Sequence, residues 1–148
     1  MASAYAEDQG RIVVGIDGSA PSKEALRWAV RQARLTGAAV DAVIAWEFLP
    51  TYGWDITPQE VDDLQATADK TLQMAIDEVA GGRSDVPIRP RVVRGHAARV
   101  LLDVAEGAEL IVVGSRGHGG FAGALLGSVG QYCVQHAACP VVVIRGTR

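Results

Sequence analysis

The sequence predicts an α/β fold: one domain with a doubly wound, five-stranded parallel sheet in the strand order 3-2-1-4-5 and helices on both faces. Two observations lead to this prediction. Short apolar runs alternate with longer segments of helical periodicity, in the order β-α-β-α-β-α-β-α-β, which is typical of parallel strands joined by right-handed crossovers. The chain also has 148 residues, enough for one core but not for a second domain. We expect residues 11–146 to form the domain and residues 1–10 to be a flexible segment.

The first half of the chain supplies two strands and the helix between them. Residues 11–16 are mainly apolar and form the first expected strand, and residues 39–46 form the second. Between them, apolar residues recur at helical spacing, with Pro21 in the first turn and Gly37 at the end. Because these are the usual helix positions of proline and glycine, we expect an amphipathic helix that packs on the sheet.

A long loop and a long helix follow. Residues 47–57 combine proline, glycine and aromatic residues without a period, so we expect a loop that could act as a lid. Thr57 and Glu60 form a predicted capping box, with Pro58 at the first helical position. The apolar stripe of this helix comprises Val61, Leu64, Ala68, Leu72, Ala75, Ile76 and Val79.

The third strand is expected at an edge of the sheet. It spans residues 86–93 and contains Pro87 and Pro90, and proline is confined to edge strands because it cannot donate to a neighbouring strand. A short helix should follow between Gly95 and Gly107.

The last third of the chain repeats the strand–helix–strand pattern. The apolar residues 111–113 predict a buried fourth strand. Ser128 and Gln131 have capping-box spacing, so a helix should run over about residues 129–137. Residues 140–145 form the last expected strand.

Composition excludes several classes of function. The formal net charge is −3 and 49% of the residues are hydrophobic, which argues against a nucleic-acid or polybasic membrane partner. No apolar run approaches the roughly 20 residues of a membrane span, and the N-terminus lacks signal-peptide features. We therefore expect a soluble, cytoplasmic protein. Cys133 and Cys139 are too few for a zinc site and lack redox spacing, so buried thiols are expected.

A glycine-rich stretch joins the fourth strand to the last helix. Gly114 and Gly117 follow the strand, and Gly127-Ser128 stands where the helix should begin. Glycine lets the backbone approach a ligand closely, and a helix N-terminus favours an anion. The expected strand order places this loop beside Asp17, at the end of the first strand, in the crevice where doubly wound folds bind ligands. The two loops together predict a phosphate or nucleotide site.

The common nucleotide fingerprints are absent from the sequence. There is no Gly-x-x-x-x-Gly-Lys-Ser/Thr, and the loop after the first strand lacks Gly-x-Gly-x-x-Gly. The acidic pair and the lysine of receiver domains are also missing. No nucleophile–base pair, carboxylate dyad or metal cluster can be recognised, so we assign no catalytic residue and expect a binding protein rather than an enzyme.

The remaining glycine spacing resembles the ATP-binding motif of universal stress proteins. That motif is Gly114, two residues, Gly117, nine residues and then Gly127-Ser128. An Asp-Gly-Ser that begins at Asp17 is also similar to the family, and the likeness extends over about residues 11–145. The resemblance implies an ATP-binding protein of the stress response, with Mg²⁺ as the usual companion of a triphosphate.

The resemblance also implies which residues contact the nucleotide. Near the adenine and ribose we expect Gly15, Ile16, Asp17, Ala45 and Trp46, the last two through the backbone. Near the ribose and phosphates we expect Val113, Gly114, Arg116, Gly117, Gly127, Ser128, Val129 and Gly130. Arg116 would add positive charge, and the residues at the start of the last helix would give backbone N–H groups together with the Ser128 hydroxyl.

Structural roles stay open for several of these residues. Ser128 could cap its helix only, Asp17 could cap the turn after the first strand, and Arg116 could be a solvated loop residue. The glycines could simply permit tight turns. Alternatives also remain for the function: a binder of cyclic AMP or another adenine nucleotide, a slow ATP hydrolase, or a purely structural dimer.

The last strand predicts a homodimer. Val141–Ile144 is apolar on both faces, yet the expected strand order puts it at an edge of the sheet, where unpaired backbone groups are exposed. Pairing with a second copy would cover the apolar side chains and the unpaired backbone groups. The family resemblance also implies dimerisation through this strand.

Overall fold

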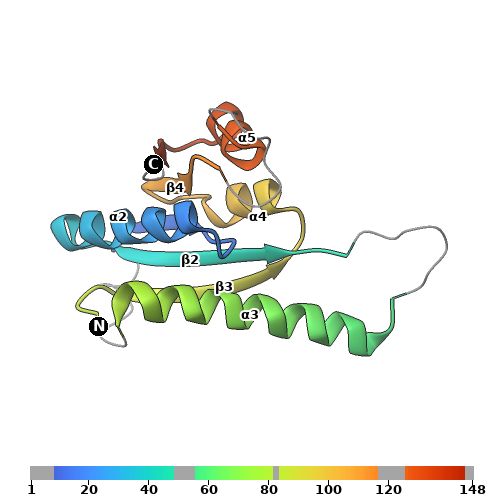
Figure 1. The fold of residues 1–148 in the computed structure, drawn as a ribbon. Helices are drawn as coiled ribbons and strands as arrows, with labels where there is room; N and C mark the ends of the chain where they lie inside the picture. Colours follow the sequence, from blue (N-terminus) through green and yellow to red (C-terminus); the bar gives the residue numbers. More distant parts are fainter. Residues whose placement is uncertain (1–8, 49–55, 82–83, 117–125, 146–148) are drawn as a thin grey trace.

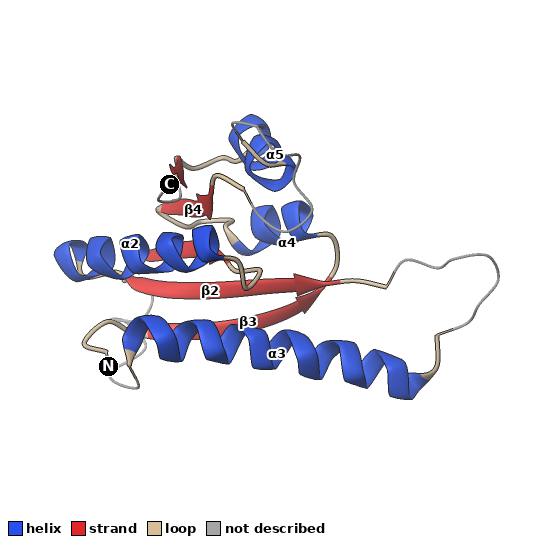
Figure 2. Cartoon of the chain, viewed as in Figure 1, coloured by secondary structure: helices blue, strands red, loops and turns tan. Residues whose placement is uncertain are grey.

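Five parallel strands form one sheet with the order β3-β2-β1-β4-β5, as predicted (Figure 1). The computed structural model describes residues 9–48, 56–81, 84–116 and 126–145. Helices and strands alternate along the chain (Figure 2). In order, the elements are β1 (Arg11–Gly15), α2 (Ala20–Thr36), β2 (Ala39–Trp46), α3 (Pro58–Ala80), β3 (Ile88–Arg94), α4 (Ala97–Val104), β4 (Leu110–Gly114), α5 (Ser128–His136) and β5 (Val141–Ile144).

Helices cover both faces of the sheet, as predicted (Figure 1). Successive side chains of a strand point to opposite faces, so each strand contributes to two hydrophobic cores. The core on the α2 and α3 side includes Ile12, Val14, Val40, Ala42, Val112, Leu26 and Leu72. The core on the α4 and α5 side includes Val13, Val43, Ile111, Val113, Leu101 and Cys133. The central strands are therefore apolar on both faces, as a covered parallel sheet requires.

Local signals set the ends of α2 and α3. The Ser19 side chain caps α2 by accepting a hydrogen bond from the Ser22 amide, and the helix ends at Gly37, whose φ of 77° is left-handed. The predicted capping box of α3 is present, because Thr57 and Glu60 each bond the other's backbone. Both helices therefore begin at residues that satisfy their otherwise unpaired amides.

The predicted capping box of α5 is wrong. Gly127 is the N-cap residue, with φ −70° and ψ 167°, and no side chain caps the helix. Ser128 is already its first helical residue. The Gln131 side chain instead donates to the Leu126 carbonyl oxygen at 2.9 Å. The helix begins one residue earlier than the Ser-x-x-Gln spacing indicates, because Gly127 adopts the extended backbone of an N-cap.

The apolar stripe of α3 is buried over only part of its length. Ala68, Leu72 and Ala75 are buried, but Val61 is half-buried and Leu64 is 37% exposed. The amino-terminal part of α3 extends beyond the carboxyl ends of the strands that it accompanies (Figure 1). A periodic pattern predicts which side of a helix is apolar, but not where the sheet beneath it ends.

β3 lies at an edge of the sheet, as predicted. The Val40 amide donates to the Pro87 carbonyl oxygen and the Gly95 amide to the Trp46 carbonyl oxygen, both at 2.8 Å. Because backbone groups of a parallel strand alternate in direction, the odd-numbered residues of β3 bond to β2 and Pro90 faces the outer edge. That edge therefore lacks one N–H donor, which opposes pairing with a further strand.

β5 forms the other edge, and its outer side contains no proline. The carbonyl oxygens of Pro140 and Ile144 accept hydrogen bonds from the chain of β4, at 3.0 and 2.8 Å. The backbone groups of Val141 and Val143 therefore face outward. All four residues of β5 are half-buried.

Some predicted features lie outside the described residues. These are most of the proposed lid, residues 49–55, as well as Gly117 and residues 1–8. In the ranges that the structure describes, none of the helices is both long enough and apolar enough to cross a membrane.

Candidate functional site

A pocket lies at the carboxyl ends of β1, β2 and β4, next to α4 and the first turn of α5. It is lined by Gly15, Ile16, Asp17, Ser22, Val43, Ala45, Ala97, Leu101, Val113, Gly114, Arg116 and Val129. β1 and β4 are neighbours in the sheet but not in the sequence, so the winding of the chain reverses between them. Ligands of doubly wound folds bind at this position.

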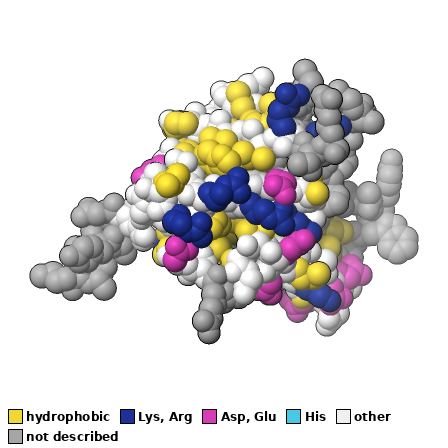
Figure 3. Space-filling view, turned by 60° about the vertical axis from the view of Figure 1, so that its left-hand side comes forward, with side chains coloured by type: hydrophobic (Ala, Val, Ile, Leu, Met, Phe, Trp, Pro, Cys, Tyr) yellow, Lys and Arg dark blue, Asp and Glu magenta, His cyan; other side chains and the backbone are white. Residues whose placement is uncertain are grey.

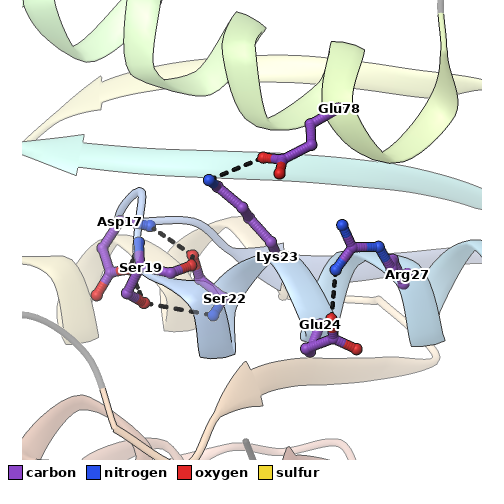
Figure 4. A network of polar contacts seen from close by, with 7 residues as sticks. All are labelled: Asp17, Ser19, Ser22, Lys23, Glu24, Arg27 and Glu78. Carbon is purple, nitrogen blue, oxygen red and sulfur yellow. Dashed lines mark hydrogen bonds and ion pairs between the residues drawn. The ribbon is translucent and has the colours of Figure 1, made fainter. Parts of the chain in front are cut away.

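Hydrogen bonds fix the loop between β1 and α2 (Figure 4). The Ser19 amide donates to Asp17 Oδ1 at 2.9 Å, and the Ser19 hydroxyl donates to the same oxygen. The Ser22 hydroxyl donates to the Ser19 carbonyl oxygen at 2.9 Å and accepts from the Asp17 amide at 3.3 Å. Asp17 is thereby held in place at the amino terminus of α2, where the helix dipole favours its negative charge.

An ion pair connects the start of α2 to α3. Lys23 Nζ lies 2.8 Å from a carboxylate oxygen of Glu78 (Figure 4). The hydrogen bond and charge of Lys23 lower the pKa of Glu78. Because Glu78 is exposed, the pair adds little to stability, but it joins the helix that carries Ser22 to its neighbour.

Two strand-end glycines allow helices to approach the sheet closely. A Cβ atom on Gly114 would lie 2.7 Å from Pro21 Cβ and 2.8 Å from the Pro21 carbonyl carbon. One on Gly15 would lie 2.9 Å from Leu101 Cδ1. Neither position has room for a side chain without a shift of its neighbours. Gly114 is therefore needed for α2 to pack on β4, whatever its role toward a ligand.

The first turn of α5 closes one side of the pocket. Val129 lines the pocket, and Ser128 beside it is exposed. The Gly127 amide already donates to the Ser115 carbonyl oxygen at 2.7 Å, so in this structure it is not directed at a ligand. A Cβ on Gly130 would lie 2.7 Å from Leu126 Cδ1. The amides of a helical first turn have no partner within the helix, which makes this turn suited to an anion.

Ala45 and Trp46 lie on opposite faces of the sheet. Ala45 lines the pocket and packs with the core on the α4 side. Trp46 packs with the core on the α2 and α3 side, where the Arg94 guanidinium lies 5.5 Å from its ring centroid. This alternation follows from strand geometry. The Trp46 side chain is therefore directed away from the pocket.

The structure brings most of the predicted site residues together. Those that line the pocket are Gly15, Ile16, Asp17, Ala45, Val113, Gly114, Arg116 and Val129. Gly127, Ser128 and Gly130 adjoin Val129 in the chain but are not part of the lining. Trp46 is on the other face, and Gly117 lies outside the described residues.

Four lining residues were not predicted from the sequence: Ser22, Val43, Ala97 and Leu101. Ser22 was detectable, because it is a polar residue on the buried face of α2, in line with Ala25 and Leu26. Ala97 and Leu101 are one helical turn apart, but their position over the ends of β1 and β2 depends on tertiary packing.

The lining is suited to recognition. Its wall is largely apolar, and its ionisable groups are the Asp17 carboxylate and the guanidinium of Arg116, which is exposed. Within the described ranges, no three or more His, Cys, Asp or Glu side chains are arranged to hold a metal ion. The apolar wall of the pocket can hold a ring system, and the Asp17 carboxylate and the Arg116 guanidinium can bind polar groups of a ligand.

The sheet and the pocket define a doubly wound α/β domain with a pocket at the point where its winding reverses, the position at which domains of this class bind their ligands. A family model described as the Universal stress protein family matches residues 10–145. The chain belongs to the universal stress protein family, as the glycine spacing indicated.

Relatives in mycobacteria and solved structures support this assignment. Universal stress protein Rv2623 of Mycobacterium tuberculosis (strain ATCC 25618 / H37Rv) is 37% identical over 140 residues, which are 93% of this chain and 46% of the relative. The chain thus spans about half the length of the curated relatives it matches. Universal stress protein UspA from Lactobacillus plantarum has a TM-score of 0.77 and 25% identity, covering 92% of this chain and 97% of that one. A universal stress protein in complex with cAMP has a TM-score of 0.61 and 25% identity, covering 94% and 98%.

Proposed function

We propose that the pocket binds ATP and that nucleotide occupancy makes this chain a regulatory protein of the cytoplasmic stress response. In the proposed complex the adenine lies on the apolar wall formed by Val43, Ala45 and Leu101. The ribose lies near Asp17, and the phosphates extend toward Arg116 and the first turn of α5.

One observation carries the proposal: an apolar recess at the switch point of the sheet has a fixed carboxylate on one side and a helix N-terminus on the other. The recess suits a flat base, and the carboxylate suits ribose hydroxyl groups. The helix N-terminus and Arg116 suit phosphates. The cAMP complex of a family member supports an adenine nucleotide as the ligand.

Mg²⁺ is proposed as the companion of the triphosphate. Asp17 is the only carboxylate of the described residues in the pocket lining, and it already accepts two hydrogen bonds from Ser19. We therefore assign the cation mainly to phosphate oxygens and water, which is the usual mode of Mg²⁺ binding with nucleotides.

We also propose that two copies pair through β5. The outward backbone groups of Val141 and Val143 can extend the sheet, whereas Pro90 interrupts the corresponding edge of β3. Val143→Pro would remove one outward donor and keep the bonds to β4. We expect light scattering at micromolar concentration to show a dimer for the wild type and a folded monomer for this variant. A wild-type monomer would contradict the proposal.

Calorimetric titration with ATP, ADP and cyclic AMP tests the nucleotide proposal. Ala97 begins α4 and lines the pocket, so Ala97→Leu should fill the recess with little effect on helix propensity. We expect ATP affinity to fall by at least about tenfold. Ala66→Leu, on the exposed side of α3, is the matched control and should bind like the wild type. Absence of ATP binding below millimolar concentration would refute the proposal.

Cyclic AMP is the second candidate ligand, because a structural neighbour is a cAMP complex. Arg116→Gln separates the two candidates. Loss of the guanidinium should weaken ATP, with its chain of phosphates, more than cyclic AMP, with its single phosphate charge. Tighter binding of cyclic AMP than of ATP by the wild type would favour the second candidate. Rapid ATP turnover would instead indicate a hydrolase.

A further inference from the structure

A second groove lies at the opposite end of the sheet from the nucleotide pocket, where the strands begin. It is lined by Arg11, Asp41, Arg89, Arg91, Asp103 and Val104, and we call it the arginine groove. Figure 3 turns the end at which the strands begin toward the viewer and shows basic side chains gathered there, with acidic side chains beside them. The chain as a whole has a net charge of −3, so this basic cluster is a local feature.

A buried carboxylate organises the arginine groove. Asp41 is only 2% exposed. Its Oδ1 accepts from Arg89 Nε at 2.7 Å and its Oδ2 from Arg11 Nη1 at 3.3 Å. Arg11 also donates to the carbonyl oxygens of Val104, at 2.6 Å, and Glu106. Asp41 and Arg11 thus form a frame that holds the Arg89 guanidinium in a defined orientation.

Two arginines of this groove have donors to spare. The bond of Arg89 to Asp41 uses Nε, and the Arg89 side chain is 51% exposed. Arg91 is exposed and forms no ion pair with the described residues. The two residues are two apart on β3, so they share a face of the sheet at a spacing of about 7 Å. A guanidinium fork binds a carboxylate through two parallel hydrogen bonds.

The surroundings of the groove favour a protein partner over a small ligand. On this face α4 packs on β1 and β2, and α5 on β4 and β5, so β3 is left accessible. Among the residues that the structure describes, Val104 is the only apolar one in the lining. An open polar groove buries too little of a small molecule to hold it. Pro90 at the outer edge opposes the addition of a strand. Recognition must therefore use side chains.

We propose that the arginine groove docks an acidic segment of a partner protein, whose Asp or Glu carboxylates bind Arg89 and Arg91. Three arginines against two aspartates leave one excess positive charge in the groove. Arg89 and Arg91 are separate guanidinium groups about 7 Å apart along the strand, so they match two spaced carboxylates of a peptide better than a single phosphate. This surface is independent of the proposed nucleotide site.

The test titrates the full chain with a blocked octapeptide that alternates glutamate and alanine, followed by NMR of the arginine Nε–H signals. The wild type should bind it, and binding should weaken several-fold when salt rises from about 50 to about 300 mM. Arg91→Gln removes no ion pair, so the fold should persist, and affinity should fall at least about fivefold. Arg94→Gln, on the same strand but beside Trp46, is the matched control and should bind like the wild type. Ala97→Leu should also retain binding, which separates this proposal from the nucleotide site.

Three results would overturn the proposal. The first is equal binding of a peptide with glutamine in place of glutamate. The second is an equal loss of affinity in Arg91→Gln and Arg94→Gln. The third is tighter binding of inorganic phosphate than of the peptide, with the same Arg89 and Arg91 signals shifted, which would make the groove a small-anion site.

Discussion

Gly114→Ala tests how the carboxyl end of β4 is built. The new Cβ would lie 2.7, 2.8 and 2.9 Å from the Cβ, carbonyl carbon and oxygen of Pro21. Two of these atoms are backbone of the first turn of α2, so the helix start itself must move. Overpacking of this kind costs about 1–3 kcal/mol, and the lower chain entropy of the unfolded alanine variant returns less than about 1 kcal/mol. We expect a net loss of about 1–2 kcal/mol in the free energy of unfolding.

Urea unfolding followed by circular dichroism measures this loss, and calorimetry measures ATP affinity in parallel. Because the shift of Pro21 also moves Ser22 in the pocket lining, affinity should fall together with stability. Gly37→Ala is the control. Gly37 has a φ of 77° and open space around it, so the alanine substitution should lower stability through backbone strain alone. Gly37 follows the last residue of α2, at the end of the helix that is away from the pocket. A Gly114→Ala loss below about 0.5 kcal/mol with unchanged affinity would refute the reasoning.

Three further predictions concern single side chains. Gly15→Ala should cost little stability, because the new Cβ would come too close only to the flexible end of Leu101 and would make an ordinary contact with Val113. It should weaken ATP binding by narrowing the pocket, and unchanged affinity would contradict this. Burial raises the pKa of Cys133 to about 11, so at about pH 8 a thiol reagent should label Cys133 only after unfolding. Rapid labelling of both Cys133 and Cys139 in the native protein would contradict this prediction. The hydrogen bond from Arg34 lowers the pKa of Asp85, so this pair stabilises the fold above the ordinary pKa of 3.8 and loses its effect as the pH falls through the lowered value. Asp85→Asn should thus unfold slightly more easily than the wild type at about pH 6, and the difference should vanish at low pH; a difference that grows on acidification would be the wrong sign.

The element types and the edge position of β3 could be predicted because they follow from periodicity, turn residues and proline. Gly37 and the apolar run after it placed β2 at residues 39–46, where the structure has it. Pro90 placed β3 at an edge, and the hydrogen-bond pattern shows that this proline faces outward. Each of these predictions depends on chain geometry that acts over a few residues.

Features that depend on contacts between distant elements could not be predicted. The close packing of Pro21 on Gly114 joins α2 to β4, and a glycine at the end of a strand does not by itself indicate which helix packs against it. Leu64 belongs to the apolar stripe of α3 but is partly exposed, because α3 continues past the strands. The frame around Asp41 joins β1, β2 and β3, and a single aspartate in an apolar strand did not indicate it.

The charged residues of the candidate site were predicted from the sequence more fully than the apolar residues that form its wall. Asp17 and the glycine-rich segment after β4 are recognisable by residue type and spacing, and of the described residues Asp17, Gly114 and Arg116 line the pocket. Ala45 and Trp46 were predicted to contact the ligand through their backbone, which stays a prediction. The Ala45 side chain lines the pocket and the Trp46 side chain packs on the other face, as strand alternation requires. The position of Leu101 in the pocket lining could not be predicted, because it depends on how α4 packs across β1 and β2.

NMR of the chain with ATP tests the central claim most directly. Nuclear Overhauser effects between the adenine protons and the methyl groups of Ala45, Ala97 and Leu101 report on the apolar wall of the pocket. We expect all three contacts at saturating ATP, and their loss in Ala97→Leu at the same ATP concentration. Saturable ATP binding without any of these contacts, or with contacts to another part of the surface, would contradict the assignment of this pocket as the nucleotide site.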